Sequence, residues 1–68
     1  MTEPLRINGE DQPFAAMSVA ALLQARGIAE KRGLAVAVNG AVVPTLLWPE
    51  TKLNPGDAVE IVRPFGGG

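Results

Sequence analysis

Three consecutive glycines, Gly66, Gly67 and Gly68, place the most available reactive group of this chain at the C-terminal carboxylate. Glycine has no Cβ, so such a segment can extend through a channel too narrow for other side chains. The run also leaves the terminal carbonyl unhindered, and an achiral terminal residue cannot epimerise while its carboxylate is activated. We therefore expect the Gly68 carboxylate itself to be the functional group.

The other side chains offer little chemistry of their own. The sequence contains no cysteine and no histidine, which excludes disulfides, thiolate metal sites and the usual general acid or base. Serine and threonine hydroxyls are present, but no histidine could activate them as nucleophiles. We expect no catalytic residue, no metal site and no independent enzymatic activity.

Charge and hydropathy argue against nucleic-acid-binding, secreted and membrane-spanning proteins. The 68 residues carry six basic and seven acidic side chains, a formal charge of −1, with no basic stripe and few aromatic residues. This composition gives little support to nucleic-acid binding. The first residues lack the pattern of a signal peptide, and no apolar run approaches the roughly 20 residues of a membrane span. The expectation is a soluble cytoplasmic protein without membrane contact.

The elements that must position the glycine run follow from periodicity and turn residues. The pattern predicts strands at residues 5–8, 12–15, 34–38, 41–43 and 58–63. Ser18 is a suitable N-cap for a helix over 19–26, which Gly27 would end. Residue 13 is a proline, which places the second strand at a sheet edge, while 34–38 is wholly apolar and predicts a strand buried on both faces or nearly so. Residues 45–51 predict a turn or short 3₁₀ segment tucked under the sheet, with Trp48 in the core.

Two Asn-Gly pairs, Asn8-Gly9 and Asn39-Gly40, predict hairpins, with a longer first loop that includes Glu10-Asp11 as the alternative at Asn8-Gly9. Residues 54–57 predict a turn before the last strand. One helix with one apolar stripe must cover one face of one sheet. If the last strand enters between the hairpins, parallel to the first strand, the fold is α+β: a β-grasp with a mixed sheet of four to five strands and one helix across one face. We expect a β-grasp domain over 1–63 and a flexible glycine tail over 64–68.

An ordered set of motifs covers nearly the whole chain. In chain order they are Ile7-Asn8-Gly9, Ser18-Val19, Leu22-Leu23, Val36-Ala37-Val38-Asn39-Gly40, Val43-Pro44, Trp48, Thr51-Lys52-Leu53, Pro55-Gly56-Asp57, Val59-Glu60-Ile61-Val62 and Gly66-Gly67-Gly68. Together they resemble the ThiS family, the ubiquitin-like β-grasp sulfur carriers of thiamin biosynthesis. The chain departs from the family pattern at Pro64-Phe65, where small or aliphatic residues are expected.

The resemblance implies a sulfur carrier that binds no cofactor itself. A ubiquitin-activating-like adenylyltransferase of the ThiF type would use ATP to adenylate the Gly68 carboxylate. Sulfur from a donor such as a cysteine desulfurase persulfide would then displace AMP and leave a thiocarboxylate. A thiazole synthase of the ThiG type would receive the sulfur and build the thiazole ring.

The residues around the tail have predicted roles as well. Pro64 lacks a backbone donor, so strand pairing should end near Arg63. Phe65 would then anchor the tail (Phe65, Gly66, Gly67 and Gly68) in a partner's channel, or else fold back on the sheet edge. Val62 and Arg63 are a possible docking surface, against the plainer interpretations of an ordinary exposed apolar residue and a solvated charge.

Three other functions are compatible with the same elements. The chain could be the small subunit of a molybdopterin-synthase-like enzyme, a ubiquitin-like modifier that forms isopeptide bonds to lysines, or a simple β-grasp interaction module. The acceptor enzyme, conjugates to lysine, and the effect of deleting Gly67 and Gly68 distinguish these alternatives from the thiamin carrier.

Overall fold

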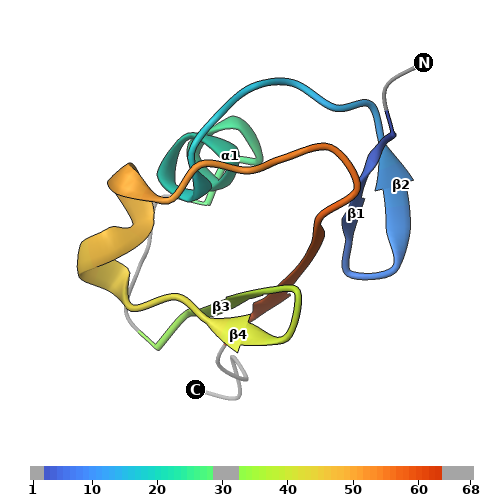
Figure 1. The fold of residues 1–68 in the computed structure, drawn as a ribbon. Coiled ribbons are helices and arrows are strands. Elements are labelled where there is room, and N and C mark those ends of the chain that lie inside the picture. Colours follow the sequence, from blue (N-terminus) through green and yellow to red (C-terminus); the bar gives the residue numbers. More distant parts are fainter. Residues whose placement is uncertain (1–2, 29–32, 64–68) are drawn as a thin grey trace.

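The computed structural model describes residues 3–28 and 33–63, which form one mixed sheet, one α-helix and one 3₁₀ helix (Figure 1). The elements are β1 (Leu5–Ile7), β2 (Glu10–Gln12), α1 (Val19–Ala25), β3 (Ala35–Val38), β4 (Ala41–Val42), η1 (Thr45–Glu50) and β5 (Ala58–Val62). The strand order is β2-β1-β5-β3-β4, with β1 parallel to β5 and the other neighbours antiparallel. The predicted β-grasp topology is therefore confirmed, with the last strand between two hairpins.

Both hairpins turn at their Asn-Gly pairs. Asn8 and Gly9 have φ angles of 51° and 85°, and Asn39 and Gly40 have 52° and 85°. Positive φ at both central residues is the type I′ turn, whose twist matches that of the strands it joins. The turn also corrects one boundary. The second strand was predicted over 12–15, but it spans Glu10–Gln12, because a two-residue turn sets Glu10 directly opposite Ile7.

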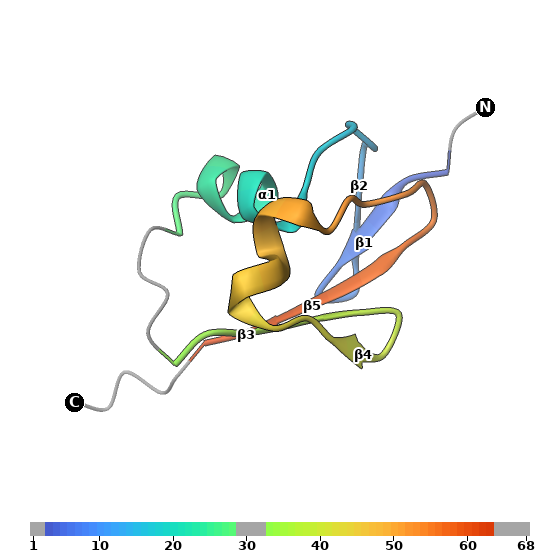
Figure 2. The same cartoon turned by 60° about the vertical axis from the view of Figure 1, so that its left-hand side comes forward.

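One face of the sheet is covered by α1 and η1 (Figure 2). The Ser18 side chain caps α1 by accepting a hydrogen bond from the Ala21 N–H at 3.1 Å. The helix ends at Gly27, with φ of 76°, and the Ile28 N–H donates to the Leu23 carbonyl at 2.9 Å. This is the predicted glycine-terminated end. The buried core consists of Leu5, Ile7, Val19, Leu22, Leu23, Leu34, Val36, Trp48, Leu53, Val59 and Ile61.

The prediction that β3 is buried on both faces is wrong. Val36 is buried, but its neighbour Ala35 is exposed, and Ala37 and Val38 are only partly buried. Both helices lie on the same side of the sheet, so the outward face of β3 is left uncovered. Ala35 continues the apolar sequence of β3, but its methyl group is small enough to be exposed to solvent at little cost.

The segment η1 matches its prediction at Trp48 and differs at its neighbours. Trp48 is buried in the core, and its indole N–H donates to the Val43 carbonyl at 2.8 Å. Leu46 and Leu47, expected to be tucked under the sheet, are 88% and 47% exposed. A 3₁₀ helix has three residues per turn, so only one residue in three can face the core, and Trp48 occupies that position.

The chain after η1 is tied back to the beginning of α1 before it enters β5. The Val19 N–H donates to the Thr51 carbonyl at 2.8 Å, and the Leu53 N–H donates to the Met17 carbonyl at 3.0 Å. The predicted turn over 54–57 follows, with Gly56 at φ of 85°. The direction and starting point of β5 are thus set from the helical side of the molecule.

Candidate functional site at the end of the central strand

The central strand β5 is the element that leads to the predicted tail, and both of its neighbours hold it. On one side it pairs with β3 in a register that runs from Val38 opposite Val59 to Ala35 opposite Val62. On the other side it is parallel to β1, where the Asn8 N–H donates to the Val59 carbonyl at 2.9 Å. The β1 pairs involve only Ala58 and Val59, so the position of Val62 is set by its pairing with Ala35 of β3.

The Asn8 side chain continues this pairing beyond the point where β1 stops. Its Oδ1 accepts from the Ile61 N–H at 2.7 Å, and its Nδ2 donates to the Ile61 carbonyl at 3.3 Å. The strand β1 ends at Ile7, one residue before the turn. The side-chain amide therefore substitutes for the backbone of a longer β1 and satisfies both polar groups of Ile61.

Asn39 has the matching role at the other end of β5. Its Oδ1 accepts from the Ala58 N–H at 3.0 Å, and its backbone N–H donates to the Ala58 carbonyl at 2.7 Å. Its Nδ2 donates to Asp57 Oδ1 at 2.9 Å, while Asp57 Oδ2 accepts from the Asn54 N–H at 2.8 Å. The first residue of each type I′ turn thus binds the central strand through its side chain.

Sequence reasoning treated both asparagines only as turn residues. The feature that could have indicated the contacts is that both turns have asparagine at their first central position. Aspartate also tolerates that backbone conformation, but only an amide offers a donor and an acceptor together. Asn8 uses both to bind the backbone N–H and carbonyl of Ile61, and Asn39 uses both on Ala58 and Asp57.

The uncovered face of the sheet carries an apolar patch beside the end of β5. Val62 is 62% exposed and lies opposite Ala35, and Val42 is 73% exposed and lies opposite Ala37. Residues opposite each other on neighbouring strands project to the same face. We call these four residues, Val62, Ala35, Ala37 and Val42, the open-face patch. The outward orientation predicted for Val62 is confirmed.

Charged residues border this patch. Glu60 lies opposite Ala37 and is exposed, and Arg63 is exposed directly after β5. The surface that precedes the tail is therefore apolar with one acidic and one basic side chain at its margin. The predicted tail residues Phe65, Gly66, Gly67 and Gly68, together with Pro64, lie outside the described residues.

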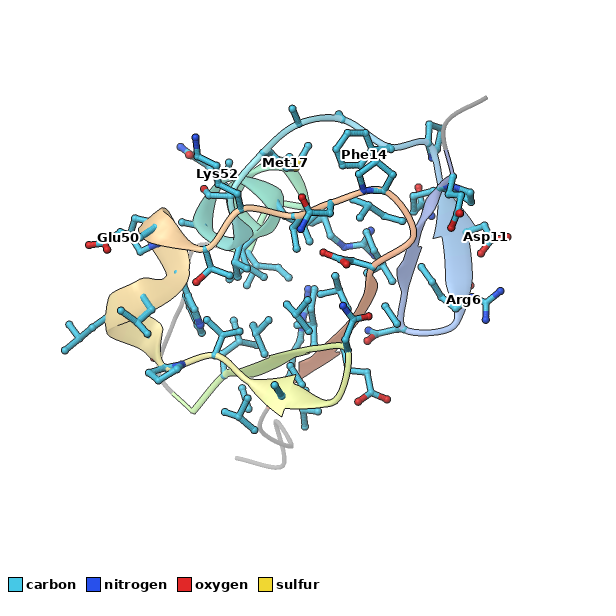
Figure 3. The ribbon with its side chains drawn as sticks, in the orientation of Figure 1. Arg6, Asp11, Phe14, Met17, Glu50 and Lys52 are labelled. Atoms are coloured by element: carbon cyan, nitrogen blue, oxygen red, sulfur yellow. The ribbon has the colours of Figure 1, made fainter. Side chains whose placement is uncertain are left out.

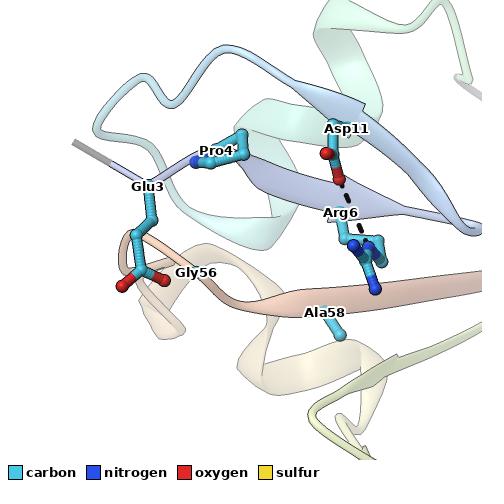
Figure 4. Close-up of a pocket in the computed structure, with 6 residues that line it drawn as sticks. All are labelled: Glu3, Pro4, Arg6, Asp11, Gly56 and Ala58. Carbon is cyan, nitrogen blue, oxygen red and sulfur yellow. Dashed lines mark hydrogen bonds and ion pairs between the residues drawn. The ribbon is translucent and has the colours of Figure 1, made fainter. Parts of the chain in front are cut away.

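Two hollows in the described surface lie away from Val62. One, of about 340 Å³, is beside Ala58 at the opposite end of β5 (Figure 4). It is lined by Glu3, Pro4, Arg6, Asp11, Gly56 and Ala58. Arg6 Nε donates to Asp11 Oδ1 there at 3.2 Å, but both side chains are more than half exposed, so solvent screens the pair.

A second hollow, of about 220 Å³, lies at Met17 and Lys52 (Figure 3). The first hollow is lined by no hydroxyl or thiol. Ser18 and Lys52 both line the second, but the Ser18 hydroxyl is the cap of α1 and accepts from the Ala21 N–H at 3.1 Å. Within residues 3–28 and 33–63, no group of acidic side chains could hold a metal ion. In that same part of the chain, no helix is long and apolar enough to cross a membrane. The open-face patch and the strand that precedes the tail are thus the features that distinguish this surface.

Comparison with known proteins accounts for this arrangement. The model of the ThiS family matches residues 5–68, which includes every strand of the sheet and the glycine run. The chain belongs to the ThiS family. The part of this ThiS-family chain that the family model matches continues past β5 to Gly68, so it includes the predicted tail.

Relatives and solved structures agree with this assignment. The ThiS-family chain is 34% identical over 62 residues to the sulfur carrier protein ThiS of Thermus thermophilus, covering 91% of this chain and 95% of that protein. The crystal structure of the thiamine biosynthesis protein ThiS from Geobacter metallireducens superposes with a TM-score of 0.80 at 31% identity, covering 96% of this chain and 99% of that one. The β-grasp fold is therefore that of the ThiS structures.

Another relative is a longer protein. The ThiS-family chain is 43% identical over 65 residues to a thiazole synthase of Paramagnetospirillum magneticum. The match covers 94% of this chain but only 20% of that protein, so the chain spans about a fifth of this relative.

Proposed function

We propose that this protein is a sulfur carrier of thiamin biosynthesis, with the Gly68 carboxylate as the group that carries the sulfur. The observation that supports this most directly is the family match over residues 5–68, which joins a complete β-grasp to the glycine run. The composition agrees, because a chain without cysteine or histidine has no competing thiol and lacks the imidazole that most often serves as a general base. The protein is then a substrate of its partner enzymes.

The proposed chemistry takes place in three steps. In a ThiF-type adenylyltransferase, a carboxylate oxygen of Gly68 attacks the α-phosphorus of ATP, and pyrophosphate leaves. A persulfide sulfur then attacks the terminal carbonyl, and AMP leaves with the electrons of the broken C–O bond. A thiol cleaves the resulting acyl disulfide and leaves the thiocarboxylate. A cysteine desulfurase is the proposed source of the persulfide, and ATP binds the activating partner.

A thiazole synthase of the ThiG type is the proposed acceptor. The relative from Paramagnetospirillum magneticum supports this partner, because a segment similar to this chain forms a fifth of a protein named thiazole synthase. A sequence of this kind sharing one polypeptide with a thiazole synthase is consistent with the two acting on one another.

The open-face patch is the proposed docking surface, with Val62 and Arg63 nearest the tail. Five residues, 64–68, can span on the order of 16–18 Å when extended. That length would carry the carboxylate into a partner's active site while the sheet docks outside. Ordering the tail costs on the order of 1–2 kcal/mol per residue, so contacts at Phe65 and at the patch must compensate. Burying one large apolar side chain contributes about 1.5–3 kcal/mol.

The test of the carrier chemistry is the intact mass of the chain after incubation with a ThiF-type adenylyltransferase, ATP and a persulfide source. We expect a mass gain equal to the exchange of one oxygen for sulfur. Deletion of Gly67 and Gly68 should abolish the gain without changing the circular dichroism spectrum. No gain in the intact chain, with an enzyme that activates an authentic ThiS, would contradict the proposal.

The docking surface has its own matched pair of variants. Val62→Asp places a charge in the open-face patch, whereas Leu46→Asp places one on η1, at a residue that is even more exposed. Both should leave the fold intact, since neither side chain is buried. We expect Val62→Asp to weaken binding to the adenylyltransferase about tenfold, the loss of roughly 1.4 kcal/mol, and Leu46→Asp to leave it unchanged. Equal effects of the two variants would rule out the patch as the docking surface.

The acceptor separates the remaining functions. Transfer of the sulfur to thiazole synthase would support the thiamin carrier, and transfer only to a molybdopterin precursor would support the small-subunit alternative. Conjugates to lysine in cell extracts would instead identify a modifier. Full activity after deletion of the terminal glycines would leave a β-grasp interaction module.

A further inference from the structure

We infer that Asn39 is a site of spontaneous deamidation in the folded protein, and that it reacts before Asn8. Both asparagines precede glycine, in Asn39-Gly40 and Asn8-Gly9. Both are also exposed residues in tight turns whose side chains hold the central strand. The residues that secure β5 are therefore also the residues whose sequence makes them chemically labile.

The reaction requires only water. The backbone nitrogen of Gly40 attacks Cγ of Asn39, the new N–C bond closes a succinimide ring, and the side-chain nitrogen leaves as ammonia with the proton of the glycine amide. Water then opens the ring at either carbonyl, which gives aspartate or isoaspartate at position 39. Glycine has no side chain to hinder the attack, so it is the most permissive following residue. In sum, one water is consumed and one ammonia is released.

In the closed turn, the hydrogen bonds of Asn39 oppose this attack. Oδ1 is held by the Ala58 N–H and Nδ2 by the Asp57 carboxylate, so the amide is fixed toward β5. Cγ reaches the Gly40 nitrogen only when these contacts open. The rate of deamidation in the native protein thus reports how often the turn opens.

The two turns differ in how easily they open. Both side-chain bonds of Asn8 are part-buried, and both go to the backbone of Ile61, a core residue. The side-chain bonds of Asn39 to Ala58 and Asp57 are exposed to solvent. Exposed hydrogen bonds with few buried contacts around them open at lower free energy than those at the core. The Asn39 turn should therefore be the one that reacts first.

The product would loosen the start of β5. An aspartate at position 39 places a second carboxylate where the amide now donates to Asp57 Oδ1 at 2.9 Å. The attraction becomes a repulsion, and Asp57 also holds the Asn54 N–H of the preceding turn. Isoaspartate adds a methylene to the backbone of a two-residue turn, whose length fixes the strand register. Deamidation at position 39 would thus weaken the contacts that hold the beginning of β5, the strand that leads to the tail.

The sequence supplies its own controls for the experiment. Asn8 and Asn39 are each preceded by a β-branched residue and followed by glycine, so their intrinsic rates should be closely similar in the unfolded chain. The third asparagine, Asn54, precedes Pro55, whose ring nitrogen has no proton to lose and cannot close the succinimide. Asn54 is therefore the internal negative control, at which no succinimide-dependent deamidation is expected.

The experiment is a time course of the full chain at mildly alkaline pH, with deamidation at each asparagine followed by peptide mass spectrometry in ¹⁸O water. In the folded protein we expect Asn39 to react several-fold faster than Asn8, and in concentrated urea we expect equal rates. Asp57→Ala removes one partner of the Asn39 amide and should raise its rate by about three- to tenfold. Asp11→Ala, an exposed change near the other turn, should leave both rates unchanged.

Three results would overturn the inference. Asn8 could react as fast as Asn39 in the folded protein, Asp57→Ala could fail to change the rate at position 39, or the folded chain could resist deamidation at both turns while the unfolded chain reacts. As an independent readout, Asn39→Asp should lower the stability of the domain. A stability equal to that of the parent would show that the modification has no structural consequence.

Discussion

Replacing Asn8 with glycine removes its side-chain amide while keeping the backbone free to adopt the φ of 51° that the turn requires. The change deletes two hydrogen bonds, of 2.7 Å to the Ile61 N–H and 3.3 Å to the Ile61 carbonyl. Such bonds contribute about 0.5–1.5 kcal/mol each to stability. We therefore expect Asn8→Gly to lower the free energy of unfolding by about 1–3 kcal/mol. Asn8→Ala should lower it by about 1 kcal/mol more, because alanine in the left-handed region is strained.

The assay is urea denaturation followed by circular dichroism, with the slope of the transition checked for constancy. For a domain of this size, 1 kcal/mol corresponds to about 4–8 °C in Tm, so thermal melts provide a second measurement. Amide hydrogen exchange tests the mechanism directly, because the Ile61 N–H should lose protection relative to the other amides of β5. Asp11→Ala is the matched control, since its ion pair with Arg6 is exposed and should contribute less than about 1 kcal/mol.

The result that would refute this reasoning is specific. If Asn8→Gly matched Asp11→Ala in stability and the Ile61 amide kept its protection, the side chain would not be extending β1. Water or a rearranged neighbour would then satisfy Ile61, and asparagine at this position would serve the turn alone.

Substitutions at three further positions test how the helical layer and the last turn are held. Trp48→Phe should lower the free energy of unfolding by about 2–3 kcal/mol, because it leaves the Val43 carbonyl without its 2.8 Å donor and opens space in the core. Urea denaturation followed by circular dichroism measures this, and a loss below about 1 kcal/mol would contradict it. Ser18→Ala should cost about 1 kcal/mol by the same melt, because the Ala21 N–H loses its cap, and Ser18→Asp should restore most of it. Gly56→Ala, at φ of 85°, should lower Tm by several degrees, an effect that unchanged thermal melting would exclude.

Sequence patterns predicted the parts of this fold that depend on local chemistry. The Asn-Gly turns, the Ser18 cap, the glycine after α1 and the alternation of β5 each follow from neighbouring residues and were confirmed. The resemblance of the whole ordered set of motifs predicted the topology, because local patterns alone do not say which strands pair.

Apart from the boundary of β2, the errors occurred where burial depends on distant parts of the chain. An apolar strand such as β3 has the same sequence whether one or both of its faces are covered, and only the placement of α1 and η1 on one side exposes Ala35. Similarly, Leu46 and Trp48 differ in burial because of the geometry of η1, which hydrophobicity does not encode. The side-chain contacts of Asn8 depend on a residue 53 positions away, beyond the reach of any local pattern.

The position of β5 has a consequence for biosynthesis. The middle strand of the sheet is the last to leave the ribosome, and its parallel partner β1 is among the first elements made. Until β5 emerges, the two hairpins can form locally, but β1 and β3 each present an unpaired edge to other nascent chains. Insertion of β5 would close both edges at once. A chain truncated before this strand could therefore neither complete its sheet nor present a tail. Only chains that contain β5 would fold.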